Sequence, residues 1–208
     1  MEYKTKQEQF WAGEFGDSYI VRNKGNKVLS SNVALFGEIL SKTRNVKSAI
    51  EFGANIGLNL RAIAQLDKGI ALSAIEINKK AVRALKKMKN VKTYSQSILD
   101  YSPDYPRNFV FTKGVLIHFD PDYLPHVYDL LHESSNRYIC IIEYYNPTPV
   151  EIPYRGHRDR LYKRDFAGEL LDRHDDLILA SYGFVYHRDN NFPQDDINWF
   201  LLEKTTKQ

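Results

Sequence analysis

Cysteine is nearly absent from this sequence: Cys140 stands alone, so an intrachain disulfide is excluded. It lies in the apolar run 138–142, where we expect a small buried residue of a strand. The sequence also lacks an apolar stretch long enough to span a membrane, and its polar first residues lack the apolar core of a signal peptide. We therefore expect a soluble, cytoplasmic protein without a membrane partner.

A large excess of charge is also missing. The 29 basic residues only slightly outnumber the 26 acidic ones, and this surplus is no evidence of a nucleic-acid-binding surface. No internal repeat, low-complexity tract or serine or cysteine triad is apparent, and no Cys/His cluster has the spacing of metal ligands. The sequence therefore predicts no metal site and no triad chemistry.

The chain does contain alternating strand and helix patterns. With 208 residues and 43% hydrophobic content, it fits one compact α/β domain. Residues 10–26 are rich in aromatics without clear periodicity, which predicts an irregular segment with a short helix. Strands are expected within 48–52, 70–76, 91–94, 108–116, 137–144, 178–186 and 198–203, helices within 31–43, 58–66, 78–89, 123–133 and 166–173, and a loop over 150–165.

The stretch 48–61 organises the rest. An apolar strand passes through Gly53 and Gly57, which permit a tight turn and close approach of a ligand, into a helix whose first N–H groups are free. About 20 residues further on, a second apolar run ends in Glu76, suitably placed for ribose hydroxyls. Together these features indicate a nucleotide-type cofactor site, with an ordinary β-to-α corner as the alternative.

The segment Glu51-Phe-Gly-Ala-Asn-Ile-Gly57 resembles the first motif of class I S-adenosylmethionine-dependent methyltransferases. Asn55 replaces the middle glycine, and asparagine tolerates left-handed backbone angles better than most residues. The acidic start argues against a dinucleotide enzyme, because the carboxylate of Glu51 would repel a pyrophosphate, whereas a sulfonium cofactor carries a positive centre. The resemblance implies S-adenosylmethionine as the cofactor.

A narrower resemblance covers nearly the whole chain. Residues 8–19, the cofactor turn, 113–118 and 143–147 together are similar to the methylases associated with pseudaminic acid biosynthesis. This implies an α/β fold with a doubly wound, seven-stranded, mostly parallel sheet and an antiparallel closing strand. It divides the single domain, 1–208, into a cofactor-covering segment and helix (1–45) and the α/β core (46–208). The implied acceptor is a small molecule, an amino sugar, sugar nucleotide or nonulosonic acid precursor, methylated on an amine or hydroxyl.

The resemblance also implies which residues hold the cofactor. The N-terminal segment of such enzymes folds over it, and Tyr19 and Arg22, three residues apart, could hold its carboxylate. Trp11 and Tyr19 could equally cap an exposed edge of the core. The residues expected to bind the cofactor are Trp11, Tyr19, Arg22, Glu51, Gly53, Asn55, Gly57, Glu76, Ser97, Ile98 and Thr112.

His118 is the candidate general base, because its pKa is ordinarily near neutral and it should lie at the lip of the fourth strand. A histidine hydrogen-bonded at a helix start is the alternative. Glu143 and Tyr145 could orient an amine, or could be scaffold. The basic loop 150–165 could clamp a carboxylate or phosphate, or could be merely solvated. The residues expected to bind the acceptor are Asn146, Arg155, His157 and Arg158.

Two other functions stay open. The basic loop slightly favours a methyltransferase acting on RNA or protein, and a cofactor-binding domain without activity has the same sequence features. A homodimer is also left open, since nothing in the sequence decides the oligomeric state.

Overall fold

The computed structural model describes residues 3–22, 25–156 and 158–205. Its centre is a seven-stranded sheet of order β3-β2-β1-β4-β5-β9-β8. β1 to β5 are parallel, while β9 is antiparallel to both β5 and β8. The strands are β1 (Ser48–Phe52), β2 (Ala71–Glu76), β3 (Val91–Ser95), β4 (Arg107–Lys113), β5 (Ser135–Glu143), β8 (Leu177–Val185) and β9 (Ile197–Lys204). This confirms the predicted mostly parallel sheet with its antiparallel closing pair.

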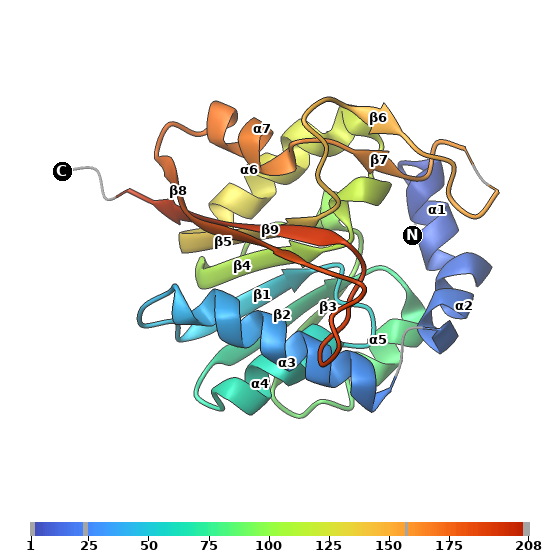
Figure 1. Ribbon diagram of the computed structural model, residues 1–208. Coiled ribbons are helices and arrows are strands. Elements are labelled where there is room, and N and C mark those ends of the chain that lie inside the picture. Colours follow the sequence, from blue (N-terminus) through green and yellow to red (C-terminus); the bar gives the residue numbers. More distant parts are fainter. Residues whose placement is uncertain (1–2, 23–24, 157, 206–208) are drawn as a thin grey trace.

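Helices cover both faces of the sheet (Figure 1). One face packs against α3 (Asn26–Ser41), α4 (Leu58–Leu66) and α5 (Lys79–Leu85), and the other against α6 (Leu124–Glu133) and α7 (Phe166–Arg173). Two apolar clusters, one on each face, form the core, and the central strands are apolar throughout because both of their faces are buried. Cys140 is fully buried within β5, as predicted.

The N-terminal segment differs from the prediction. Residues 10–26, expected to be irregular with one short helix, contain the last turn of α1 (Lys6–Ala12) and all of α2 (Glu14–Arg22). A capping box starts α1, in which the Thr5 hydroxyl accepts from the Glu8 backbone N–H and the Glu8 carboxylate accepts from the Thr5 N–H. Aromatic side chains that gave no clear periodicity pack against one another across the two helices, as Phe10 does on Phe15. The helices therefore form through contacts that a periodicity search does not detect.

Smaller differences concern element ends. The helix expected to end at residue 89 stops at Leu85, because the chain turns there to enter β3. The loop expected over 150–165 includes a two-stranded ribbon of β6 (Val150–Glu151) and β7 (Tyr162–Lys163). Short 3-10 turns are η1 (Ile98–Asp100), η2 (Leu116–His118) and η3 (Pro121–Tyr123). Asp120 caps η3, because its side chain accepts from the Asp122 backbone N–H.

Within the described ranges, no helix has both the length and the apolar character needed to cross a bilayer.

Candidate functional site

A cavity of about 220 Å³ lies at the carboxyl ends of β1, β2 and β4, beneath α1 and α2. This is more than ten times the roughly 10–15 Å³ that one water needs, so the space suits a small molecule. In Figure 1, α1 lies beside the β6–β7 ribbon and α2 lies beside α5. The predicted site residues that line the cavity are Trp11, Tyr19, Glu51, Gly53, Asn55, Glu76, Ser97, Ile98 and His118.

The turn after β1 needs left-handed backbone angles at each of its three predicted positions. Gly53, Asn55 and Gly57 have φ of 76°, 48° and 78°. A Cβ on Gly53 would lie 2.7 Å from a methyl carbon of Val115, so only glycine fits between the turn and the β4 loop. A Cβ on Gly57 would lie 2.8 Å from Leu85, and Gly57 does not line the cavity. Its role is to let the start of α4 pack closely against Leu85 of α5.

Asn55→Gly is expected to keep the site intact, because glycine suits φ of 48°. It loses one acceptor oxygen, so affinity for the cofactor should fall by about tenfold at most, or about 1 kcal/mol. The matched variant Asn55→Val should lower the free energy of unfolding by about 1–2 kcal/mol, since a β-branched residue resists the left-handed region. Calorimetry and urea unfolding measure the two effects. Much tighter binding by the glycine variant would show that the asparagine side chain obstructs the site.

Three residues in and around this turn have an acceptor oxygen without a partner among the described residues. Glu51 is 1% exposed, and its Oε1 accepts from the Asn59 side-chain amide at 2.5 Å while its Oε2 has no partner within the described part of the chain. The side-chain oxygens of Asn55 and Asn59 are also buried without partners, and all three residues line the cavity. Burial raises the pKa of Glu51 to about 8. An ammonium group, with three donors and a positive charge, satisfies such a set.

Glu76 ends β2 beside this turn. Its carboxylate accepts from the Asn55 and Asn78 backbone N–H groups, each at 2.7 Å, and the carboxylate keeps free lone pairs on the cavity side. Burial raises the pKa of Glu76, although these hydrogen bonds oppose the shift. A fixed, buried carboxylate at the end of β2 suits a pair of ribose hydroxyls.

The far end of the cavity is closed by the loop after β3. Ile98 lies on its wall, and the Ser97 hydroxyl donates to Glu8 of α1 while also capping η1. Glu8 was not foreseen here, although the capping box in which it takes part is readable from the sequence. An apolar wall with a few polar groups suits a purine ring.

The two N-terminal helices cover the cavity with aromatic rings. The ring centroids of Trp11 and His118 lie 4.6 Å apart. The face of the Trp11 ring favours a nearby positive charge such as a sulfonium. Tyr19 also lines the cavity, whereas Arg22 stacks over the Phe15 and Tyr19 rings outside it. The structure therefore does not bring Arg22 to the position expected of a carboxylate ligand.

His118 presents a neutral acceptor nitrogen. Its Nδ1 lies 2.6 Å from the Arg160 carbonyl oxygen, which can only accept, so Nδ1 carries the proton and Nε2 keeps its lone pair. Burial lowers the pKa of His118 to about 4. It is therefore uncharged at neutral pH and accepts hydrogen bonds, but it is a weaker proton acceptor than the near-neutral pKa expected from the sequence implies.

Lys113 and Asn32 line the same cavity and were missed by the sequence argument. The Lys113 ammonium donates to the Asn32 side-chain oxygen at 3.1 Å, and burial lowers the pKa of Lys113 to about 8. Lys113 was visible as a charged residue within the apolar strand expected over 108–116, and the structure places it at the end of β4. Asn32 had no such signal, because it comes from α3, far away in the sequence.

The structure does not bring Glu143, Thr112 and Tyr145 to the cavity. Glu143 points into the loop after β4, where its oxygens accept from the backbone N–H groups of Val115 and Leu116 and from the Thr112 hydroxyl. Tyr145 is 40% exposed and packs on Phe200. Contact of these residues with an acceptor or cofactor therefore has no support in the geometry, and Glu143 instead positions the loop that carries His118.

Three of the four expected acceptor-binding residues, Asn146, Arg155 and Arg158, do not line the cavity. Arg155 and Arg158 are exposed, and Asn146 folds back on Thr148 through a hydrogen bond within the chain segment. His157 lies outside the described residues. The loop does approach the N-terminal helices, since the Gln7 side chain donates to the Asp159 carbonyl at 3.3 Å. It thus contributes to holding α1 in place.

No protein-family profile and no curated protein sequence matches this chain. Solved structures do match it. A SAM-dependent methyltransferase from Leishmania major has 14% identity over 95% of this chain and 81% of its own, with a TM-score of 0.71. A 1,6-didemethyltoxoflavin N1-methyltransferase from Burkholderia thailandensis, with its substrate and S-adenosylhomocysteine bound, has 13% identity over 96% and 87%, with a TM-score of 0.70.

A magnesium protoporphyrin IX methyltransferase from Synechocystis, with bound S-adenosylhomocysteine, has 14% identity over 98% of this chain and all of its own, with a TM-score of 0.67. At such identities the likeness establishes the architecture. The chain therefore has the class I methyltransferase fold.

Proposed function

We propose that this protein is an S-adenosylmethionine-dependent methyltransferase acting on a small molecule. One observation carries the proposal: Glu51, Asn55 and Asn59, which line the cavity, each have a buried oxygen without a partner among the described residues, and the buried carboxylate of Glu76 lines the same cavity from the neighbouring strand. The amino-acid tail and the ribose of this cofactor offer donors to those two groups. The solved methyltransferases with the same fold support the same cofactor class.

When bound, the cofactor supplies a methyl group on a positively charged sulfur. The chain's own part is to hold cofactor and acceptor in line and to keep water away. α1 and α2 cover the cavity, and the Asn78 side chain ties them to the sheet by donating to the Trp11 carbonyl at 3.2 Å and to Asp17 at 3.0 Å. Exclusion of water follows from this cover.

His118 is placed to orient the acceptor. Its Nε2 lone pair can accept a hydrogen bond from an N–H or O–H group, which directs the acceptor's own lone pair toward the methyl group. With its pKa lowered to about 4, His118 orients a neutral amine or hydroxyl rather than removing a proton from an ammonium. Proton loss from an amine then occurs before transfer.

We propose an amine-bearing sugar, as a sugar nucleotide or a nonulosonic acid precursor, as the acceptor. The narrower sequence resemblance supports it, as does the Lys113 ammonium, which can pair with a carboxylate or phosphate. The structurally similar enzymes act on molecules as different as a toxoflavin precursor and a porphyrin, so their fold does not select an acceptor. Binding of an RNA or protein acceptor would instead use the exposed side chains of Arg155 and Arg158.

Labelled S-adenosylmethionine, incubated with the protein and a panel of nucleotide-activated amino sugars, tests the activity. Label should appear in one class of sugar and stay absent with unmodified RNA or protein. Labelling of RNA, weakened by added salt, would replace the sugar proposal with the nucleic-acid alternative. Tight cofactor binding with no product from any acceptor would indicate a cofactor-binding domain without activity.

Glu76→Ala should weaken binding of S-adenosylmethionine by roughly 2–4 kcal/mol, because two charge-assisted hydrogen bonds to the ribose are lost. Glu76→Gln keeps the shape of the side chain, and its affinity for S-adenosylmethionine should lie between that of the parent and that of Glu76→Ala. Calorimetry with Glu38→Ala, an exposed carboxylate on α3, serves as the control. Unchanged affinity in Glu76→Ala would remove Glu76 from the cofactor site.

A further inference from the structure

Two histidines and an aspartate meet at the edge of the sheet opposite the cavity. His132 lies in the last turn of α6, His174 directly follows α7, and Asp176 directly precedes β8. α6 leads into the amino end of β5, whereas the cavity lies at the carboxyl ends of β1, β2 and β4. None of the three is among the described residues that line the cavity, so this cluster is separate from the proposed methyl-transfer site.

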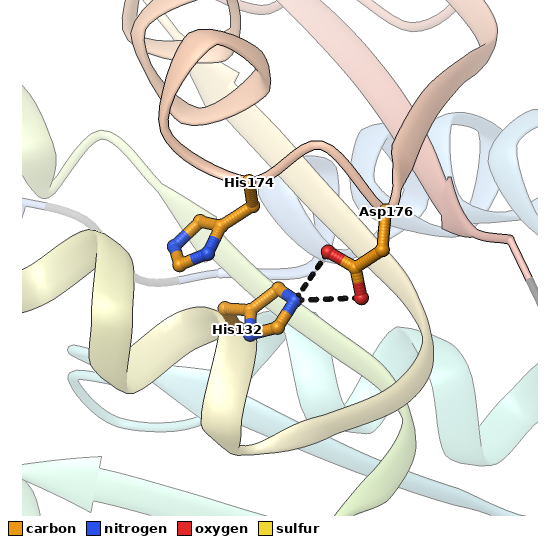
Figure 2. Close-up of side chains that lie close together, drawn as sticks. All are labelled: His132, His174 and Asp176. Carbon is orange, nitrogen blue, oxygen red and sulfur yellow. Dashed lines mark hydrogen bonds and ion pairs between the residues drawn. The ribbon is translucent and has the colours of Figure 1, made fainter. Parts of the chain in front are cut away.

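The three side chains face one another (Figure 2). Nε2 of His132 lies 2.8 and 3.0 Å from the two Asp176 oxygens, and the His132 and His174 rings stack with centroids 4.0 Å apart and 2° between their planes. One candidate ligand atom from each residue lies within 4.8 Å of the others. Zinc bonds of about 2.0–2.2 Å in a tetrahedron place ligand atoms roughly 3.3–3.6 Å apart, so binding needs shifts of up to about 1.5 Å and a rotation of the stacked rings that turns both lone pairs toward the ion.

His174 has the outer partner that metal-bound histidines use. Its Nε2 is buried without a hydrogen bond and lies 3.4 Å from Asp129 Oδ1. Asp129 is itself held by two hydrogen bonds of 2.6 Å from the Arg173 guanidinium. A carboxylate on one ring nitrogen orients the ring and leaves the other, Nδ1, to bind a metal ion.

The charges nearby permit a cation. The closest basic groups are occupied, since Arg173 pairs with Asp129 and the Lys204 ammonium donates to the His132 carbonyl at 2.8 Å. Two imidazoles and one carboxylate form a donor set that suits zinc.

We propose that His132, His174 and Asp176 bind a Zn²⁺ ion that links the ends of α6 and α7 to the start of β8. The three protein ligands leave one coordination position for water. Because the site joins segments more than 40 residues apart in the sequence, the ion stabilises the packing of α6 and α7 on the sheet. This inference does not depend on the proposed methyl transfer.

The test is a Zn²⁺ titration of the full chain after treatment with a chelator, by competition with a colorimetric chelator. The unsubstituted protein should bind one ion and unfold at a higher temperature with it. His132→Ala, His174→Ala and Asp176→Asn should each weaken binding by about 100-fold or more, and Asp129→Asn by about tenfold. The control is His187→Ala, which removes an exposed histidine that pairs with Asp196, away from the cluster, and should bind as the parent does.

A second measurement needs no substituted protein. Co²⁺ added to the unsubstituted chain should shift the NMR signals of the His132 and His174 rings far more than those of His187, which lies beyond the other end of β8. Binding that is no tighter in the parent than in His174→Ala, or Co²⁺ shifts confined to other histidines, would overturn the proposal and leave the cluster as a hydrogen-bonded contact only.

Discussion

Glu51→Gln is expected to make the cofactor-free protein more stable at pH 7 while weakening cofactor binding by about 100-fold or more. Burial raises the pKa of Glu51 to about 8 from an ordinary 4.5, so the folded protein holds this proton more tightly than the unfolded chain does. Stability contributed by the protonated carboxyl is full below pH 4.5 and is lost as the pH rises through about 8. At pH 7 the pH lies 2.5 units above 4.5, so the free energy of unfolding has fallen by roughly 3 kcal/mol.

Glutamine carries no charge, so this loss is absent from the variant. Urea unfolding should give similar free energies for the two proteins at pH 4.5 and a higher value for Glu51→Gln, by roughly 3 kcal/mol, at pH 7. Lys113 stays charged at both values, because its pKa is about 8, and other buried carboxyls contribute equally to both proteins. Equal stabilities at pH 7 would show that the folded protein tolerates the Glu51 charge without a ligand.

Cofactor binding should respond in the opposite direction. An ammonium beside Glu51 needs the ionised carboxylate, so affinity of the parent should rise by roughly tenfold per pH unit between pH 6 and 7. In Glu51→Gln the affinity should be low and independent of pH in this interval. A variant that binds S-adenosylmethionine as tightly as the parent would remove Glu51 from the cofactor site and leave Glu76 to be judged separately.

Glu143→Ala is expected to lower the free energy of unfolding by roughly 3–5 kcal/mol. The carboxylate accepts from the backbone N–H groups of Val115 and Leu116 at 2.9 and 3.0 Å and from the Thr112 hydroxyl at 3.1 Å. Glu143 is 2% exposed, so alanine leaves buried donors without partners and opens a void. Urea unfolding measures the loss, and Glu133→Ala, an exposed carboxylate of α6, should change stability by less than about 0.5 kcal/mol.

The same variant separates positioning from simple stabilisation. In the parent, NMR titration should give His118 a pKa near its lowered value of about 4. Release of the loop after β4 in Glu143→Ala should expose His118 and return its pKa toward 6.5. A large loss of stability with the His118 pKa unchanged would show that Glu143 supports the core but does not position His118.

The sequence by itself determined the sheet and the cofactor turn. Apolar strand runs alternate with segments of helical spacing, and such patterns can be read from a few adjacent residues. The same holds for the turn, which depends on Gly53, Gly57 and an asparagine able to hold φ of 48°. The spacing to Glu76 followed from them, since parallel neighbouring strands end at the same edge of a sheet.

Only the tertiary structure decided where other side chains point. Glu143 and Lys113 both stand at strand ends, yet Glu143 faces the loop after β4 while Lys113 faces the cavity. Asn32 reaches the same cavity from α3, and His132 and His174 meet from separate helices. Such contacts depend on how helices pack on the sheet, which brings together residues far apart in the chain, and sequence spacing carries no record of that packing.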